Sequence, residues 1–276
     1  MVEAHEAGQL SAGAFPTLEL NTGPRSRLSH RKNWLGKVRL AEHTEILVLA
    51  GHADSQAMAG AGTPGDAVDN QGAMPMQDGM RDELYWNLLT AQRIVLLGRQ
   101  RGLNMRFYDP AAEDPALRSI LDGEDPRTNW SVGRRHSEQG GYALEIHYDA
   151  YGDHGFGSGV IPRVRFGQTV VDEALAAEFG AFPSDFRGVL GAPERGITML
   201  EIGKLEGELE HSLRDPATRD AALNTIADRV VRTIATALGI PQPQFATTVS
   251  PPLPLASPSG RPDGLPYPSA ASGDAG

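Results

Sequence analysis

Four residues of types that can hydrolyse an amide bond stand at comparable places along the chain. His52 follows a short apolar run, and His147 and Glu201 lie late in two further apolar runs, whereas Glu83 begins a long amphipathic segment. Two imidazoles and one carboxylate are a common ligand set for catalytic zinc, which leaves a fourth position for water. A further carboxylate can then transfer a proton. The residue types therefore predict metal-assisted hydrolysis.

The elements that must position these residues follow from the hydrophobic pattern. Short apolar runs rich in β-branched residues predict strands, and apolar residues at helical spacing predict helices. Strands are expected at residues 44–50, 103–109, 142–150 and 197–203, and helices at residues 82–102, 169–179 and 215–238. Strands that alternate with helices indicate an α/β domain with a largely parallel sheet. Ligands bind beyond the carboxyl ends of such strands, so the four residues are expected to meet there.

The same four places carry sequence motifs. Residues 49–52 read LAGH, residues 83–88 read ELYWNL, residues 145–149 read EIHYD and residues 200–205 read LEIGKL. In their order and in the elements on which they fall, these motifs resemble those of the zinc-dependent N-acetylmuramoyl-L-alanine amidases of type 3, which cut peptidoglycan. The resemblance covers about residues 44–240.

The resemblance implies a single catalytic domain with a twisted, largely parallel sheet flanked by helices. It also implies that His52, Glu83 and His147 hold Zn²⁺ and that Glu201 transfers a proton. The implied reaction is hydrolysis of the N-acetylmuramoyl-L-alanine bond of peptidoglycan or of muropeptides. Two alternatives stay open. One is a related metallohydrolase that deacylates a small N-acyl metabolite, and the other is an inactive, amidase-like binding protein.

The chain departs from the family's motifs close to the expected site. Asp54 stands where the family has glycines, Glu145 replaces a small residue and Asp149 replaces asparagine. His154 lies in a Gly-rich segment, residues 151–159, that comes near the same edge of the sheet. Whether Asp54 or His154 joins the site is open. The added acids bear on the charge of the substrate more than on the metal.

The two ends of the chain differ in composition from its middle. Residues 1–40 are polar and without periodicity and predict an irregular N-terminal arm. Residues 241–276 are rich in Pro, Ser, Gly and Ala, and such a segment buries too little apolar surface to offset the entropy of ordering it. We therefore expect a disordered tail there and a catalytic domain over residues 41–240.

Bulk composition excludes several classes of function. The chain has no cysteine, which excludes disulfides, thiolate metal sites and a cysteine nucleophile. A formal net charge of -10 argues against nucleic acid as a partner, because such binding depends on Lys and Arg at phosphates. Neither a signal peptide nor an apolar run of about 18 residues is found. We expect a cytoplasmic protein, released by lysis if it reaches cell wall, that binds peptidoglycan fragments or small N-acyl substrates.

Other residues near the motifs receive structural interpretations. Tyr85 and Trp86 are expected in the core rather than as a platform for a sugar ring. Glu83 has a structural alternative, since a carboxylate at a helix N-terminus interacts favourably with the helix dipole. Four histidines are expected at the surface: His43, His136, His154 and His211.

Overall fold

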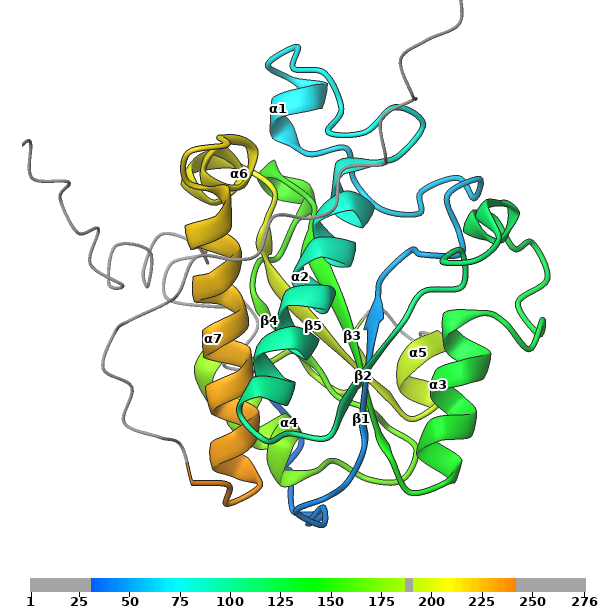
Figure 1. The fold of residues 1–276 in the computed structure, drawn as a ribbon, viewed down its shortest axis with the longest axis vertical. Coiled ribbons are helices and arrows are strands. Elements are labelled where there is room, and N and C mark those ends of the chain that lie inside the picture. The colour runs from blue at the N-terminus through cyan, green and yellow to red at the C-terminus, as the bar shows by residue number, and fades with distance from the viewer. Residues whose placement is uncertain (1–30, 187–190, 242–276) are drawn as a thin grey trace, which may run out of the picture. The chain divides into compact units, whose positions relative to one another are not determined.

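One sheet forms the centre of the described structure. The computed structural model describes residues 31–186 and 191–241. Its strands are β1 (Ile46–Ala50), β2 (Met105–Tyr108), β3 (Tyr142–Asp149), β4 (Gly159–Ile161) and β5 (Ile197–Lys204). They lie in the order β2-β1-β3-β5-β4, and all neighbours pair in parallel except β4, which is antiparallel to β5 (Figure 1). The prediction of an α/β fold with a largely parallel sheet is confirmed.

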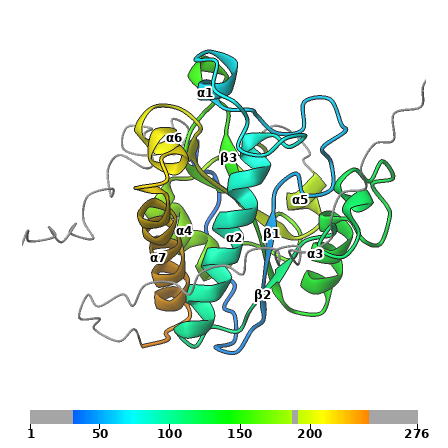
Figure 2. The same ribbon diagram turned by 45° about the horizontal axis from the view of Figure 1, so that its top comes forward.

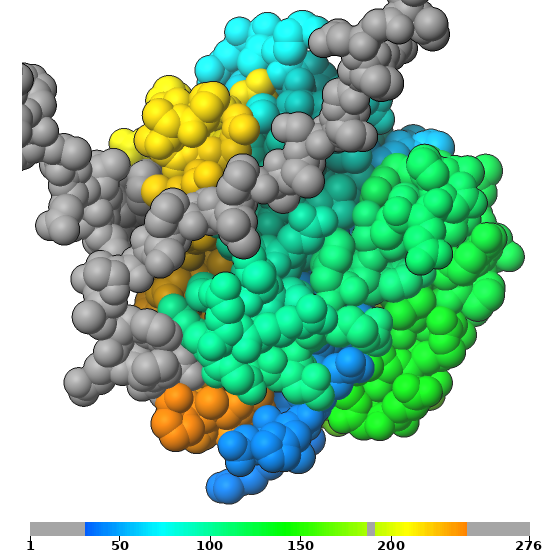
Figure 3. All heavy atoms as spheres, viewed as in Figure 1, coloured from blue at the N-terminus to red at the C-terminus, as the bar shows by residue number. Residues whose placement is uncertain are grey.

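Helices flank both faces of the sheet. They are α1 (Asp66–Asp69), α2 (Asp82–Gln100), α3 (Asn129–Glu138), α4 (Val170–Phe179), α5 (Gly191–Glu194), α6 (Gly207–Arg214) and α7 (Arg219–Ala237). Helices α2, α4 and α7 pack together on one face, and α3 and α5 cover the other (Figures 1 and 2). In the space-filling view, the segment from α2 to β2 lies near the middle of the face that is turned toward the viewer (Figure 3). No helix among the described residues is both long and apolar enough to cross a membrane.

The alternation of side chains along each strand separates two hydrophobic clusters. In β1, Ile46 and Val48 join the cluster under α2, α4 and α7, while Leu47 and Leu49 join the cluster on the opposite face. Strand β3 follows the same rule, since successive strand residues point to opposite faces. Glu145 and His147 therefore lie on the face that α3 covers.

The sequence pattern did not predict the short strand β4 or the helices α3, α5 and α6. Of these helices, α3 is largely polar. Helix α7 begins at Arg219, four residues later than expected, because residues 215–218 form a turn. The stretch from residue 58 to 79, expected as a long loop, contains the single turn α1; we call residues 58–79 the rim loop.

Residues 31–40 lie in the stretch that the sequence assigns to an irregular arm. They have almost no regular structure, yet they pack on the domain. Trp34 is buried and its Nε1 donates to the carbonyl oxygen of Phe182 at 2.8 Å, and Lys32 forms an ion pair of 2.8 Å with Glu173. The rest of the expected arm, residues 1–30, and the expected tail from residue 242 onward lie outside the described residues.

The expectation that His136 lies at the surface is wrong. His136 lies on the buried face of α3, where its Nε2 lies 2.9 Å from the carbonyl oxygen of Glu45. Burial lowers the pKa of His136, although the Glu45 groups oppose this shift. The other three histidines of that group are exposed as expected, and Trp86 is fully buried in the core.

Candidate metal centre

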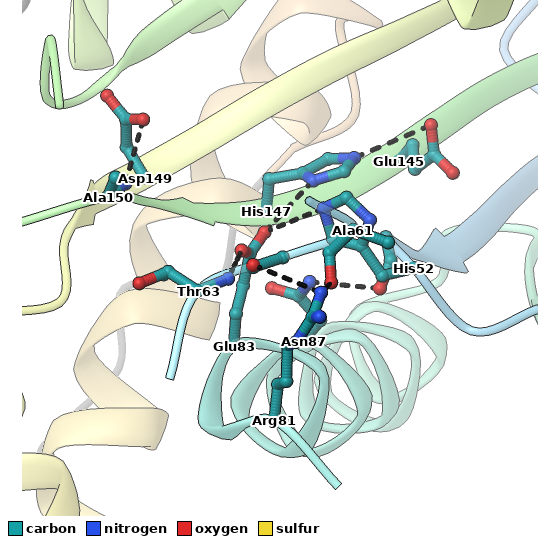
Figure 4. A network of polar contacts seen from close by, with 12 residues as sticks. His52, Ala61, Thr63, Arg81, Glu83, Asn87, Glu145, His147, Asp149 and Ala150 are labelled. Carbon is teal, nitrogen blue, oxygen red and sulfur yellow. Dashed lines mark hydrogen bonds and ion pairs between the residues drawn. The ribbon is translucent and has the colours of Figure 1, made fainter. Parts of the chain in front are cut away.

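The structure brings the three predicted metal ligands together at the carboxyl edge of the sheet. One ligand atom from each of His52, Glu83 and His147 lies within 4.8 Å of the others. Oε1 of Glu83 lies 3.2 Å from Nε2 of His52 and 3.2 Å from Nδ1 of His147 (Figure 4). A carboxylate oxygen and two imidazole nitrogens, which come from three separate elements, therefore converge on one point.

The turn after β1 presents His52 to this point. His52 has a φ of 63°, a left-handed conformation that is uncommon for residues other than glycine. Two hydrogen bonds hold the preceding Gly51. Its backbone N–H donates to the carbonyl oxygen of Ile146 at 2.8 Å, and its carbonyl oxygen accepts Nδ2 of Asn87 in α2 at 3.1 Å. A Cβ atom on Gly51 would lie 2.2 Å from Cε1 of His147. Only glycine lets the backbone pass this close to the ring.

Helix α2 and the rim loop fix Glu83 between the two rings. The carboxylate is 4 % exposed, and its Oε2 accepts the backbone N–H of Thr63 at 2.8 Å. The backbone N–H of Glu83 donates in turn to the Thr63 carbonyl at 3.1 Å. Burial alone would raise the pKa of Glu83, but the rings of His52 and His147 hold it well below its usual value. The carboxylate is thus ionised and aimed at the imidazoles.

Strands β3 and β5 bring Glu201 beside His147. The two residues are Cα partners in the parallel register, so their side chains share one face. Glu201 is 2 % exposed and lines the same cavity as the three ligands. Burial favours the neutral form of the His147 ring, but Glu145, Glu83 and Glu201 raise its pKa well above its usual value. The site is therefore rich in negative charge that a cation would balance.

The three side chains fit a zinc ion. Tetrahedral bonds of about 2.0–2.1 Å place two ligand atoms about 3.3 Å apart. The two distances from Oε1 of Glu83, both 3.2 Å, match this spacing. Nitrogen and carboxylate donors without thiolate also suit zinc. His52 Nε2, His147 Nδ1 and Glu83 Oε1 are therefore the atoms that would hold it.

A cavity of about 590 Å³ opens over this cluster. Its lining includes Asp54 and His154, the two residues whose part in the site the sequence leaves open, but neither belongs to the ligand group. Trp130, Met199 and Phe156 supply apolar wall. Among the described residues that line the cavity, none is Lys or Arg.

Asp149, which replaces the family's asparagine, fastens the loop that follows β3. Its carboxylate accepts the backbone N–H groups of Ala150 and Gly157, each at 2.8 Å, and that of Phe156. This arrangement holds the segment that carries His154 against the end of the strand. Asp149 therefore shapes the wall of the cavity.

Asn129 is the site residue that the sequence analysis missed. It is the first residue of α3, and its Nδ2 donates to the Ala50 carbonyl at 2.6 Å and to Oε1 of Glu145 at 3.3 Å. Its backbone N–H donates to Oδ2 of Asp54 at 2.7 Å. The one local signal is Thr128, a helix-capping residue type directly before it.

The rim loop that supports Glu83 is itself held by Glu210 of α6. Oε2 of Glu210 accepts the backbone N–H of Ala67 at 3.0 Å. Gly65 of the rim loop lies so close that a Cβ atom at this position would come within 2.3 Å of Oε1 of Glu210. Burial raises the pKa of Glu210 to about 7, with smaller upward contributions from Asp66 and Asp82 and opposing ones from the Ala67 amide and Arg214.

We expect the Glu210→Gln variant to lose much of the pH dependence of wild-type stability. The folded protein keeps the Glu210 proton up to about pH 7, whereas the unfolded chain releases it near 4.5. The folded state therefore binds more protons between these values, and this group lowers the free energy of unfolding as the pH rises through them. After allowance for screening by solvent, this group changes the free energy of unfolding by on the order of 1–2 kcal/mol between these pH values.

Urea denaturation at pH 5 and pH 8 measures this effect. Relative to wild type, Glu210→Gln should gain stability at pH 8. The exposed Glu138, which pairs with Arg165, provides the matched control Glu138→Gln. Parallel pH profiles for wild type and Glu210→Gln would contradict the expectation, as would an equal effect in the control.

Comparison with known proteins gives structural matches only. No protein-family model matches the sequence, and no curated protein matches it significantly. The catalytic domain of CwlV, an N-acetylmuramoyl-L-alanine amidase from Bacillus (Paenibacillus) polymyxa var. colistinus, is similar with a TM-score of 0.49 and 14% identity, over 71% of this chain and 99% of that one. Amidase AmiC2 of Nostoc punctiforme gives a TM-score of 0.40 and 14% identity, over 74% and 99%. Amidase Ami1 of Mycobacterium smegmatis gives a TM-score of 0.43 and 16% identity, over 73% of this chain and 99% of that one. These solved structures are of N-acetylmuramoyl-L-alanine amidases.

Proposed function

We propose that this protein is a zinc-dependent amidohydrolase that cleaves the bond between the N-acetylmuramoyl group and L-alanine, in peptidoglycan or in muropeptides. The observation that carries the proposal is the convergence of His52, Glu83 and His147, whose ligand atoms lie within 4.8 Å of one another. Glu201 lines the same cavity and supplies the further carboxylate that hydrolysis needs.

Each of the four residues has a distinct part in the proposed reaction. His52, Glu83 and His147 would hold the metal. A bound Zn²⁺ would polarise the amide carbonyl and lower the pKa of the attacking water. Glu201 accepts a proton as the water oxygen attacks the carbonyl carbon, and it delivers that proton to the nitrogen as the C–N bond breaks. The register with His147 keeps the Glu201 carboxylate beside the ligands during both transfers.

A second candidate function is the deacylation of a small N-acyl compound. The lining of the cavity favours it, because Asp54, Glu145 and Glu201 bring carboxylates into a space whose described lining has no Lys or Arg. Such a lining disfavours the carboxylates of a muropeptide peptide and suits a neutral or cationic acyl amine. The two candidates share the metal and the proton transfer and differ only in substrate.

Zinc content and product identity together test the proposal. We expect wild-type protein to bind a single zinc ion, to release the peptide from a muropeptide at the lactyl amide, to lose this activity on chelation and to regain it when zinc is restored. Elemental mass spectrometry counts the metal, and mass spectrometry of the products identifies the bond that is cleaved. Neutral and cationic N-acetylated amines, which lack a carboxylate, provide the comparison substrates.

Two results would overturn the muropeptide proposal in different ways. Zinc binding with turnover of neutral or cationic N-acyl amines alone would favour the second candidate. Failure to bind zinc, even in excess, would remove both candidates and leave an amidase-like binding protein.

A further inference from the structure

We propose that Glu145 is a positioning residue for the metal centre, and the inference rests on the zinc site of the proposed function. In the zinc-bound protein its carboxylate accepts the Nε2–H of His147, which leaves Nδ1 of the same ring unprotonated and aimed at the metal. The family whose motif this segment resembles has a small residue at the position of Glu145, so the arrangement belongs to this chain.

Glu145 and His147 lie two residues apart in β3 and therefore point to the same face of the sheet. Oε2 of Glu145 lies 3.5 Å from Nε2 of His147, while Oε1 of Glu83 lies 3.2 Å from Nδ1. Figure 4 shows the two carboxylates at different edges of the ring, with His52 on the Glu83 side. One edge of the imidazole thus faces the metal position and the other faces Glu145.

Nε2 of His147 needs an acceptor. It is buried and makes no hydrogen bond to any described residue, and Glu145 is its ion-pair partner. Leaving a buried N–H without an acceptor costs about 1–3 kcal/mol. The distance of 3.5 Å is a few tenths of an ångström beyond a normal hydrogen bond, so a small movement of the ring completes it.

The surroundings of Glu145 hold one of its oxygens, Oε1, and leave Oε2 for the ring of His147. Oε1 accepts Nδ2 of Asn129 at 3.3 Å, and the same amide is tied to the Ala50 carbonyl at 2.6 Å. Glu145 is 3 % exposed, so bulk water does not solvate it. It is not in the group of residues whose ligand atoms lie within 4.8 Å of one another. Its geometry is therefore that of a carboxylate that orients a ligand, a role that also raises the basicity of the ligating nitrogen.

Zinc affinity measures this role without depending on turnover. We expect Glu145→Ala to weaken zinc binding about 10- to 100-fold, the usual effect of losing a carboxylate behind a histidine ligand. Glu145→Gln keeps an acceptor oxygen on a side chain of the same length, so it should lose less zinc affinity than Glu145→Ala. Competition with a chromogenic chelator gives the dissociation constants. Glu178→Gln is the control, because that carboxylate pairs with Arg229 between α4 and α7.

The tautomer of His147 gives a second measurement on the wild-type protein. In a long-range ¹H–¹⁵N NMR spectrum of the zinc-loaded protein, His147 should carry its proton on Nε2 and bind zinc through Nδ1. A proton on Nδ1 would overturn the proposal even if Glu145→Ala failed to fold. Equal zinc affinity of Glu145→Ala and wild type would overturn it as well.

These outcomes are distinct from failure of the proposed function. If wild type binds zinc but cleaves no amide, the hydrolase proposal fails and the effect of Glu145 on zinc affinity still decides the positioning role. If wild type binds no zinc, both proposals fall together.

Discussion

Replacing Glu201 with glutamine is expected to lower kcat by about 10²- to 10⁴-fold, the usual contribution of a positioned proton-transfer group. Glutamine has nearly the same shape but cannot accept and return a proton. Because Glu201 is 2 % exposed and pairs in register with His147, no solvent group can readily take its place. The measurement is kcat on the substrate that wild type cleaves, with the zinc content determined in parallel.

The zinc content decides how the Glu201→Gln result is interpreted. An unchanged metal content together with a large loss of kcat assigns the loss to proton transfer. If the variant keeps activity within about tenfold of wild type, proton transfer by Glu201 is excluded. Loss of zinc from the variant would instead make Glu201 part of the metal site.

The Gly51→Ala variant is expected to lose most of its zinc affinity and at least about 10²-fold in kcat/KM. The added methyl group would lie 2.2 Å from Cε1 and 2.4 Å from Nδ1 of His147, so the ring must move. A displacement of about 1 Å in a catalytic geometry costs on the order of 10²-fold in rate. The same crowding should lower the free energy of unfolding by about 1–3 kcal/mol.

Gly98→Ala separates loss of stability from loss of geometry. A Cβ atom on Gly98 would lie 2.2 Å from Sδ of Met105, so this variant crowds the core at the end of α2 opposite to Glu83. We expect it to be destabilised while it keeps normal zinc affinity. Calorimetric titration with zinc compares the two variants. If Gly51→Ala binds zinc with the affinity of wild type, the His147 ring tolerates the added methyl group and the expectation is contradicted.

The elements that carry the site were predictable because their residues are patterned along the whole element. Strands β1, β3 and β5 are rich in apolar residues, as buried parallel strands are, and α2 repeats apolar residues at helical spacing over five turns. The positions of His52, His147 and Glu201 at one edge of the sheet follow from strand direction, and that of Glu83 follows from the loop that returns the chain to this edge. Their distances do not, since these depend on how far each ring and carboxylate reaches.

The parts that were missed depend on tertiary contacts. Strand β4 has three residues and exists through its pairing with β5, and α3 is a polar helix whose start is marked mainly by Thr128. Asn129 could not be assigned to the site without α3. His136 is buried because the face of α3 that carries it packs against the sheet, and this packing cannot be inferred from the local sequence pattern. The cytoplasmic location and the disordered tail stay predictions from composition.

The three ligand positions have a consequence for the energetics of folding. His52, Glu83 and His147 belong to segments far apart in the sequence. The chain between His52 and His147 forms strand β2 and the helices α1, α2 and α3, which must be in place before the ligand atoms meet. In the unfolded chain, large loops would have to close around the ion, so the proposed zinc ion would bind almost solely to the native state. Thermodynamic linkage would then stabilise the fold by about 2.7 kcal/mol when free zinc is about 100 times its dissociation constant. The supply of zinc in the surroundings would thus set the conformational stability of this protein as well as its catalytic competence.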